Sequence, residues 1–377
     1  MAELSEAGQN HEVRRSQAWL QSLKPGTCGP SNGTFIAQLL ICDLVIAANE
    51  GMIQERGGKG QKSKQGCCRA MEEEKMYSKI LVPLDGSKTA EKVLPYTRYL
   101  AGTFKVPVEL LAVVDIAEVA AHMGSEKARF LDALIDDAVR RLTSYLRVVA
   151  TTFDATGVVS CSVEKGKAED TIIEKAATDK ARLITMATHG RSGLNRFLLG
   201  SVAEKVLRGS VNPLLLIRAT DEAKSEGEAM LKSVIVPLDG SELAEGVLSL
   251  VADMAKKLDL EVELFRAYHI PYQVYSGEEG FDAGNYDELL ASVRDEAKTY
   301  LEKKAGDLER LGLAKVTCVT KEGFAGDEII ALGRTTTDKL VAMSSHGRSG
   351  VKRWVLGSVA ETVVRHAGGP VLVVRPS

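Results

Sequence analysis

The sequence lacks the features that would mark a secreted, membrane or metal-binding protein. It contains no apolar run of about 18 residues, the length of a membrane-spanning helix, and no signal peptide of ordinary form. Its six cysteines show neither Cys-x-x-Cys spacing nor a paired histidine pattern, so we expect no metal site and no disulfide framework. The cytoplasm is therefore the expected compartment, and no membrane partner is predicted.

Charge of neither sign dominates the composition. The chain has 48 Lys and Arg against 51 Asp and Glu, which gives a formal net charge of −3. A nucleic-acid-binding surface is usually basic, so no nucleic-acid partner is predicted. The motif Gly-x4-Gly-Lys-Ser/Thr is also absent, so the lysine and the magnesium-binding hydroxyl of a P-loop NTPase are missing.

Residues 1–75 differ in composition from the rest of the chain. They are rich in Gly, Ser, Gln and Lys, and include the tract Gly-Gly-Lys-Gly-Gln-Lys-Ser-Lys-Gln-Gly at 57–66, which is typical of disorder. The alternative is that this extension is mis-annotated. It would then come from an upstream start, and Met71 or Met76 would be the natural first residue. The polar, acidic segment 219–229 is expected to be a linker.

An internal repeat sets the domain count. The stretch from Met186 to Glu204 recurs from Met343 to Glu361, with His-Gly-Arg-Ser-Gly and Leu-Gly-Ser-Val-Ala-Glu unchanged. Val-Pro-Leu-Asp-Gly-Ser also occurs twice, at 82–87 and 236–241. A length of 377 residues favours two or three domains. We therefore predict one domain over 76–218 and a second over 230–377.

Strands and helices alternate through each repeat. Ser87 is predicted to cap the first helix. In the first repeat we predict strands at 80–84, 106–114, 158–163, 182–187 and 213–218, and helices from Ser87 onward and at 126–152, 169–178 and 202–208. In the second repeat a strand begins near 236, and further strands are predicted at 262–268, 316–320, 340–343 and 370–374. This alternation predicts an α/β fold with five parallel strands in each doubly wound domain.

The last strands of the two repeats are wholly apolar. Residues 214–217 and 371–374 would be exposed sheet edges if nothing covered them. We expect them to cover each other, so that the two domains form a pseudo-dimer within one chain. Further pairing between chains to give a homodimer remains open.

The repeated loop has the chemistry of an anion site. In the first copy a buried strand is followed by Gly190, Arg191 and Gly193, and then by a helix that begins near Gly200-Ser201. Ser201 and Glu204 fit a capping box, and the N–H groups of such a helix start attract an anion. Open α/β sheets bind ligands at this carboxyl edge, so the loop is predicted to hold a phosphate.

The loop pattern closely resembles the nucleotide-binding signature of the universal stress protein family, whose ATP-binding members follow Gly-x-x-Gly-x9-Gly-Ser/Thr. Gly190 is followed after nine residues by Gly200-Ser201, and Gly347 by Gly357-Ser358. The first glycine of the signature is Ala187 in one copy and Ser344 in the other. Because Ala187 leaves more room than Ser344, we expect repeat one to be the better site. The resemblance covers about residues 76–218 and 230–376.

The resemblance implies a fold of the adenine nucleotide alpha hydrolase type that binds ATP, with or without Mg²⁺. It implies that Asp85 and Asp239 contact the nucleoside, that Pro83 and Pro237 flank the pocket, and that the backbone near Val113 and Ala267 faces the base. The nucleotide-binding residues predicted from the loop and the resemblance are Pro83, Asp85, Val113, Met186, Ala187, Gly190, Arg191, Gly193, Gly200, Ser201 and Val202 in repeat one. In repeat two they are Pro237, Asp239, Ala267, Met343, Ser344, Gly347, Arg348, Gly350, Gly357, Ser358 and Val359.

Structural roles are open for several of these residues and their neighbours. Turn formation could be the sole role of the two aspartates, and helix capping the sole role of Ser201 and Ser358. Turn roles are also favoured for Gly166 and Gly323. Structural roles are favoured for His189 and His346, since no cysteine, serine or second histidine is evidently placed to partner them. Cys161 and Cys318, at equivalent places in the repeats, are expected to be small buried hydrophobic residues.

Three function classes follow. The leading one is a universal stress protein that binds an adenine nucleotide as a stress-response or energy-state module. The second is a slow ATPase or nucleotidyl-transferring enzyme of the same fold, although no catalytic residue is evident near the loop. The third is a scaffold that does not bind nucleotide and meets partners through an aromatic insert at 271–287.

Overall fold

The computed structural model describes residues 76–121, 130–153, 157–188, 199–218, 229–270, 283–336, 338–347 and 356–375. The predicted N-terminal extension 1–75 and all but the last residue of the predicted linker 219–229 lie outside these ranges. Residues 71–377 form one compact unit. Among the described helices, none combines the length and the apolar character needed to cross a membrane.

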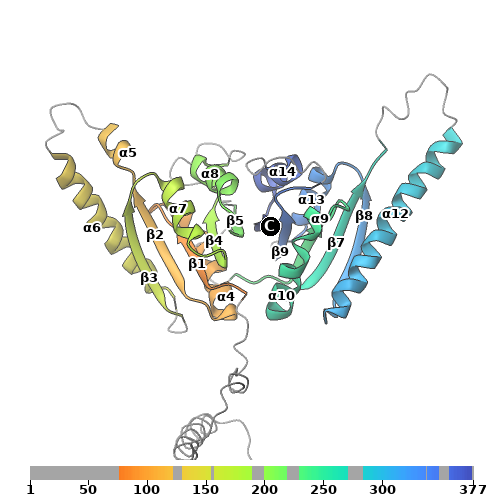
Figure 1. Ribbon diagram of the computed structural model, residues 1–377, viewed down its shortest axis with the longest axis horizontal. Helices are drawn as coiled ribbons and strands as arrows, with labels where there is room; N and C mark the ends of the chain where they lie inside the picture. Colours follow the sequence, from red (N-terminus) through yellow and green to blue (C-terminus); the bar gives the residue numbers. More distant parts are fainter. Residues whose placement is uncertain are drawn as a thin grey trace, which may run out of the picture. The chain divides into compact units, whose positions relative to one another are not determined.

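The described part of repeat one contains five strands, as predicted (Figure 1). Its elements are β1 (Lys79–Pro83), α3 (Lys88–Glu91), α4 (Leu94–Phe104), β2 (Val108–Val114), α5 (Ile116–Ala121), α6 (Leu131–Ala150), β3 (Val159–Lys165), α7 (Ala168–Ala177), β4 (Arg182–Ala187), α8 (Ser201–Gly209) and β5 (Leu214–Ile217). Ser87 caps α3 as expected, because its Oγ accepts a hydrogen bond from the Ala90 N–H at 3.1 Å.

Repeat two follows the same plan. Its elements are β6 (Ser233–Pro237), α9 (Glu242–Glu245), α10 (Leu248–Leu258), β7 (Glu261–Tyr268), α12 (Ala283–Arg310), β8 (Val316–Glu322), α13 (Ala325–Gly333), β9 (Lys339–Ser344), α14 (Ser358–His366) and β10 (Val371–Val374). The strands follow the same order in both repeats, but between the second and third strands the described residues form α5 and α6 in repeat one and α12 in repeat two.

The ten strands of the described residues form one sheet, in the order β3-β2-β1-β4-β5-β10-β9-β6-β7-β8. Pairing is parallel within each repeat and antiparallel only between β5 and β10, where Leu215 lies opposite Leu372. The prediction that the two apolar last strands cover each other is confirmed. Both leucines are fully buried, so the junction continues the core of each domain.

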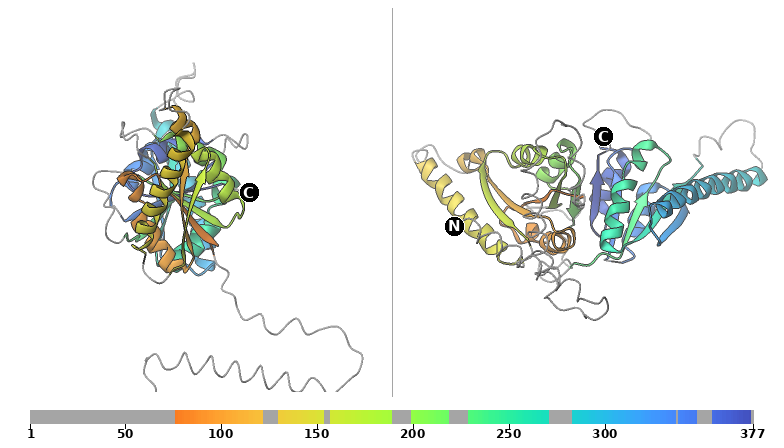
Figure 2. Two further views of the ribbon diagram at one scale, coloured as in Figure 1. Left: turned by 90° about the vertical axis from the view of Figure 1, so that its left-hand side faces the viewer. Right: turned by 60° about the horizontal axis from the view of Figure 1, so that its bottom comes forward.

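Helices cover both faces of the sheet, which makes each repeat doubly wound (Figures 1 and 2). Along β1 the side chains of Ile80 and Val82 join one apolar cluster with α4, α6, α10 and α12, whereas Leu81 joins a second cluster with α7, α8, α13 and α14. Because side chains alternate along a strand, the two clusters lie on opposite faces. Continuous apolar strands are buried in this way between two helical layers.

The helix predicted at 126–152 and the aromatic insert predicted at 271–287 both need correction. The helix predicted at 126–152 is shorter, since α6 begins at Leu131 and is preceded by the separate helix α5, while 122–129 lie outside the described residues. The insert predicted at 271–287 is described only from 283, where α12 has already begun. The helical pattern of α12 continues past its contacts with the sheet, and Figures 1 and 2 show it projecting beyond β7 and β8. Of the four aromatic residues, only Tyr286 is described, and it is helical.

The cysteine prediction was wrong for Cys161, which is exposed, and Cys318 is only half-buried. Their equivalence is confirmed, since Cys161 lies opposite Leu110 and Cys318 opposite Leu264 in the matching strand pairs. Cys161 lies on β3 and Cys318 on β8, which are the outer strands of the sheet. Each of these strands has only one neighbouring strand to shield its side chains. Partial burial still raises the pKa of both thiols, which disfavours the reactive thiolate.

Candidate functional site

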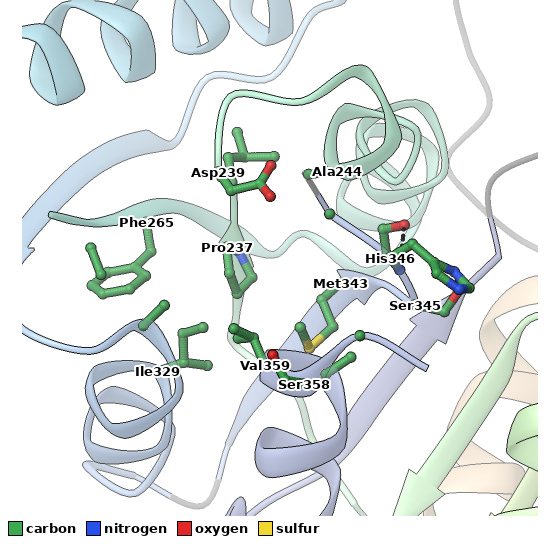
Figure 3. Close-up of a pocket in the computed structure, with 17 residues that line it drawn as sticks. Pro237, Asp239, Ala244, Phe265, Ile329, Met343, Ser345, His346, Ser358 and Val359 are labelled. Carbon is green, nitrogen blue, oxygen red and sulfur yellow. Dashed lines mark hydrogen bonds between the residues drawn. The ribbon is translucent and has the colours of Figure 1, made fainter. Parts of the chain in front are cut away.

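A cavity of about 250 Å³ opens at the carboxyl ends of β6, β7 and β9 (Figure 3). Every predicted site residue of repeat two that the structure describes lines it: Pro237, Asp239, Ala267, Met343, Ser344, Gly347, Gly357, Ser358 and Val359. Arg348 and Gly350 lie outside the described residues. Segments separated by more than a hundred positions in the sequence thus meet around one space.

The cavity also has lining residues that were not predicted to bind nucleotide. They are Leu238, Ala244, Phe265, Ala325, Ile329, Ser345, His346 and Ala360. Phe265 from β7 and Ile329 from α13 lie at one end of the cavity, and Ser345 and His346 lie at the other (Figure 3). Phe265 could have been predicted, because it is two residues before Ala267 on the same face of a strand.

The start of α14 forms one wall of the cavity. Gly357 is the N-cap residue, and its N–H donates to the carbonyl of Ser345 at 2.9 Å. A Cβ at Gly357 would lie 3.2 Å from that carbonyl oxygen, so glycine permits the close contact between loop and helix. The first N–H groups of an α-helix have no acceptor within the helix. Ser358 and Val359, which contribute two of them, both line the cavity.

The predicted capping boxes were wrong. The N-cap residues are Gly200 and Gly357, so Ser201 and Ser358 are the first helical residues, and neither helix has a side-chain cap. The helices start one residue earlier than the box requires, which moves Glu204 and its counterpart Glu361 out of the box position. Glu204 instead pairs with Arg208 at 3.2 Å, on the next turn. The serines remain at the helix starts without acting as caps.

Asp239 combines a turn role with a place in the cavity. Its Oδ1 accepts hydrogen bonds from the Ser241 N–H at 2.9 Å and from the Ser241 hydroxyl at 2.6 Å, as expected for an aspartate turn. Its Oδ2 lies against Gly347, where an added Cβ would be only 2.2 Å away. In repeat one the Asp85 Oδ1 accepts from the Ser87 N–H in the same way. The two predicted roles are therefore compatible.

His346 has a serine partner that the sequence analysis missed. Its Nδ1 lies 2.9 Å from the Oγ of Ser345, and its Nε2 is buried without a hydrogen-bond partner among the described residues. Ser345 is only 1% exposed, so its hydroxyl faces protein. Both residues line the cavity, so the structural role favoured for His346 stays a prediction. His189, its counterpart in repeat one, lies outside the described residues.

Repeat one has the same framework at its own carboxyl edge. Its described site residues are Pro83, Asp85, Val113, Met186, Ala187, Gly200, Ser201 and Val202, at or just beyond the ends of β1, β2 and β4 and at the start of α8. The Gly200 N–H donates to the Thr188 carbonyl at 2.8 Å, as Gly357 does to Ser345. Gly190, Arg191 and Gly193 lie outside the described residues. The expected advantage of repeat one therefore stays a prediction.

Two turn glycines have the structural role that was favoured for them. Gly166 and Gly323 have φ values of +152° and +143°, which L-residues with a side chain rarely adopt. Each follows the third strand of its repeat and precedes α7 or α13. Gly323, the one that belongs to repeat two, is not among the residues that line the described cavity.

Comparison with known proteins agrees with this architecture. The sequence model of the universal stress protein family matches residues 76–218 and 230–375. The chain belongs to the universal stress protein family. It is a tandem member, because both matches fall on complete five-stranded repeats.

Individual members of the universal stress protein family align with one or both repeats. A universal stress protein from Mycolicibacterium smegmatis is 24% identical over 303 residues, which covers 79% of this chain and 97% of that protein. One from Methanocaldococcus jannaschii is 29% identical over 149 residues, or 40% of this chain and 85% of that protein. The crystal structure of a universal stress protein from Archaeoglobus fulgidus has a TM-score of 0.56 at 20% identity, and covers 80% of this chain and 99% of that one. This last similarity supports the tandem fold.

Proposed function

We propose that this universal stress protein binds ATP or a related adenine nucleotide and acts in the cytoplasm as a stress-response or energy-state module. The observation that carries the proposal is the cavity of repeat two. One of its ends is apolar, at Phe265 and Ile329, and its wall includes the amino end of α14. A flat base suits the apolar end, and a phosphate suits the helix start.

The dimensions support a nucleoside inside the cavity and phosphates outside it. A volume of about 250 Å³ is just below the range of about 300–1,000 Å³ that is usual for small-molecule sites. The base and ribose would fill this space, with Asp239 beside the ribose. The phosphates would continue along the first turn of α14. Mg²⁺, where present, would come bound to the phosphates, which are its usual ligands in nucleotide sites.

Calorimetric titration of the full chain with ATP tests the proposal. We expect binding, and we expect Gly347→Val to remove it from repeat two, because its Cβ would displace Asp239 Oδ2. Gly306→Ala is the matched control, since a Cβ at Gly306 meets nothing within 4 Å. The absence of both heat and a thermal shift at millimolar ATP would exclude nucleotide binding.

A single-turnover experiment on the same protein distinguishes a binding module from an enzyme. With Mg²⁺ present, we expect bound ATP to remain intact through a single-turnover experiment. Release of ADP that disappears in Gly347→Val would favour a slow ATPase instead. Partners retained by a chain that binds no nucleotide would favour the scaffold function.

A further inference from the structure

The two repeats share a backbone arrangement beside the proposed site. In repeat two the Gly323 N–H donates to the Tyr268 carbonyl at 2.9 Å, which joins the turn before α13 to the end of β7. In repeat one the Gly166 N–H donates to the Val114 carbonyl at 3.0 Å. The residues next to these four therefore occupy matched positions in the two repeats.

The side chains at these matched positions differ. Repeat two has His269 and Phe324, whose ring centroids lie 5.3 Å apart with the planes tilted by 46°. Phe324 is 71% exposed, which is unusual for a phenylalanine beside a cavity. Two alanines beside this pair line the cavity: Ala325 lies one helical turn before Ile329 in α13, and Ala267 lies two residues after Phe265 in β7. An exposed aromatic pair thus borders the end assigned to the base.

Repeat one presents charges at the matched positions. Asp115 accepts hydrogen bonds from the N–H groups of Ala117 and Glu118 at 2.9 and 3.2 Å, so it caps α5. Lys167 is exposed. At these two described positions repeat one therefore offers a carboxylate and an ammonium group and no ring.

We propose that Phe324, with His269 beside it, stacks on the nucleobase in repeat two and makes this site selective for the base. The inference rests on the proposed nucleotide function and goes beyond it, since it assigns different selectivity to the two repeats. Stacking between a base and an aromatic ring depends on the π-face, which the lysine of repeat one cannot offer. The site of repeat one accordingly depends on phosphate contacts more than the site of repeat two.

The two positions can be exchanged with little backbone cost. Phe324 has φ −79° and ψ 128° before α13, and Lys167 has φ −76° and ψ 132° before α7. Neither side chain makes a capping hydrogen bond. Phe324→Lys and Lys167→Phe therefore form a reciprocal pair, and Phe324→Tyr is a variant that keeps the ring.

The test uses the full chain and 2-aminopurine riboside triphosphate, whose fluorescence falls when the base is stacked, with inorganic tripolyphosphate as a probe without a base. We expect Phe324→Lys to lose most of the quenching in repeat two and to weaken nucleotide binding there about tenfold. Its tripolyphosphate affinity should not change. Phe324→Tyr should keep the quenching, and Lys167→Phe should gain it.

Other outcomes would overturn the inference and identify which part failed. Unchanged quenching and affinity in Phe324→Lys would reject the stacking role while nucleotide binding stands. Equal loss of nucleotide and tripolyphosphate affinity would show that Phe324 acts on the fold rather than on the base. Failure of the unsubstituted chain to bind the nucleotide would reject the proposed function and, with it, the inference.

Discussion

The guanidinium of Arg208 in α8 lies 3.3 Å from the carboxylate of Glu361 in α14, across the boundary between the two repeats. The reciprocal pair is Arg365 with Glu204, at 3.5 Å. Each arginine also pairs with the glutamate one turn earlier in its own helix. The two helices that begin at the proposed phosphate sites are therefore joined by a four-member charge cluster.

This cluster predicts a pH-dependent contribution to stability. Hydrogen bonding and attraction from Arg365 and Arg208 lower the pKa of Glu361. A carboxyl group whose folded pKa is depressed contributes stability above its unfolded pKa, and that contribution is lost as the pH falls through the folded pKa. Since the pair is partly exposed, we expect Glu361→Gln to cost about 1 kcal/mol or less at neutral pH.

Denaturant unfolding at neutral and acidic pH checks this prediction. The difference between the wild type and Glu361→Gln should shrink as the pH falls below the usual carboxyl range, because Glu361 then becomes neutral in both states. Asp253→Asn is a suitable control, since Asp253 is exposed on α10. A difference for Glu361→Gln that persists unchanged at low pH would contradict an ion-pair origin.

The junction of β5 and β10 predicts that the repeats stabilise each other. Leu215 is fully buried and lies opposite Leu372 of the other repeat. Leu215→Ala should cost about 2–5 kcal/mol. Its effect should also reach repeat two, because the antiparallel pairing belongs to both cores.

Amide hydrogen exchange can locate the effect. Leu215→Ala should speed exchange in β10 as well as in β5. Leu146→Ala removes an equally buried leucine of α6, far along the sheet order from the junction, and should act mainly on repeat one. If exchange in β10 were no faster in Leu215→Ala than in Leu146→Ala, the repeats would be energetically independent.

Two glycines provide a matched pair for a backbone prediction. Gly323 has φ +143°, and a Cβ there would lie 3.0 Å from the Glu328 side chain, so Gly323→Ala should destabilise the protein by about 1 kcal/mol or more. Gly306 lies within α12 and has open space around it. Gly306→Ala should stabilise by about 0.5–1 kcal/mol, because alanine favours the helix. A melting temperature that shifted in the same direction in both variants would refute this account.

Much of the fold could be predicted because its signals are local and repeated. The strand predicted at 182–187 has those bounds in the structure, as β4. The pairing of β5 with β10 followed from two short apolar runs that had no other cover. The repeated motif then placed Asp239, Gly347 and Gly357 together, because parallel strands bring their carboxyl ends to one edge.

The parts that were missed depend on positions in space that the sequence does not display. Cys161 was expected to be buried because its strand is apolar, but β3 is the outer strand of the sheet. Ile329 closes the apolar end of the cavity from α13, and no motif connects it to the loop. The capping box failed by one residue because glycine took the N-cap position, a local choice between neighbouring candidates.

Asp239 allows its turn role to be separated from its role in the proposed site. Asparagine keeps an oxygen that can accept from the Ser241 N–H, so Asp239→Asn should retain the turn and most of the stability. It removes the negative charge beside Gly347, where we place the ribose. Asp239→Ala removes both the turn bond and the charge. We therefore expect Asp239→Asn to weaken ATP binding in repeat two about tenfold with little change in melting temperature, and Asp239→Ala to lower both.

Calorimetry and thermal unfolding on the same preparations measure the two effects. Asp85→Asn makes the equivalent change in repeat one, where Asp85 forms the same turn with Ser87, so the pair of variants shows which repeat contributes each binding event. If Asp239→Asn bound ATP as the wild type does, while Asp239→Ala lost both stability and binding, the aspartate would act only through the turn. The ribose would then have to be held by other residues of the cavity wall.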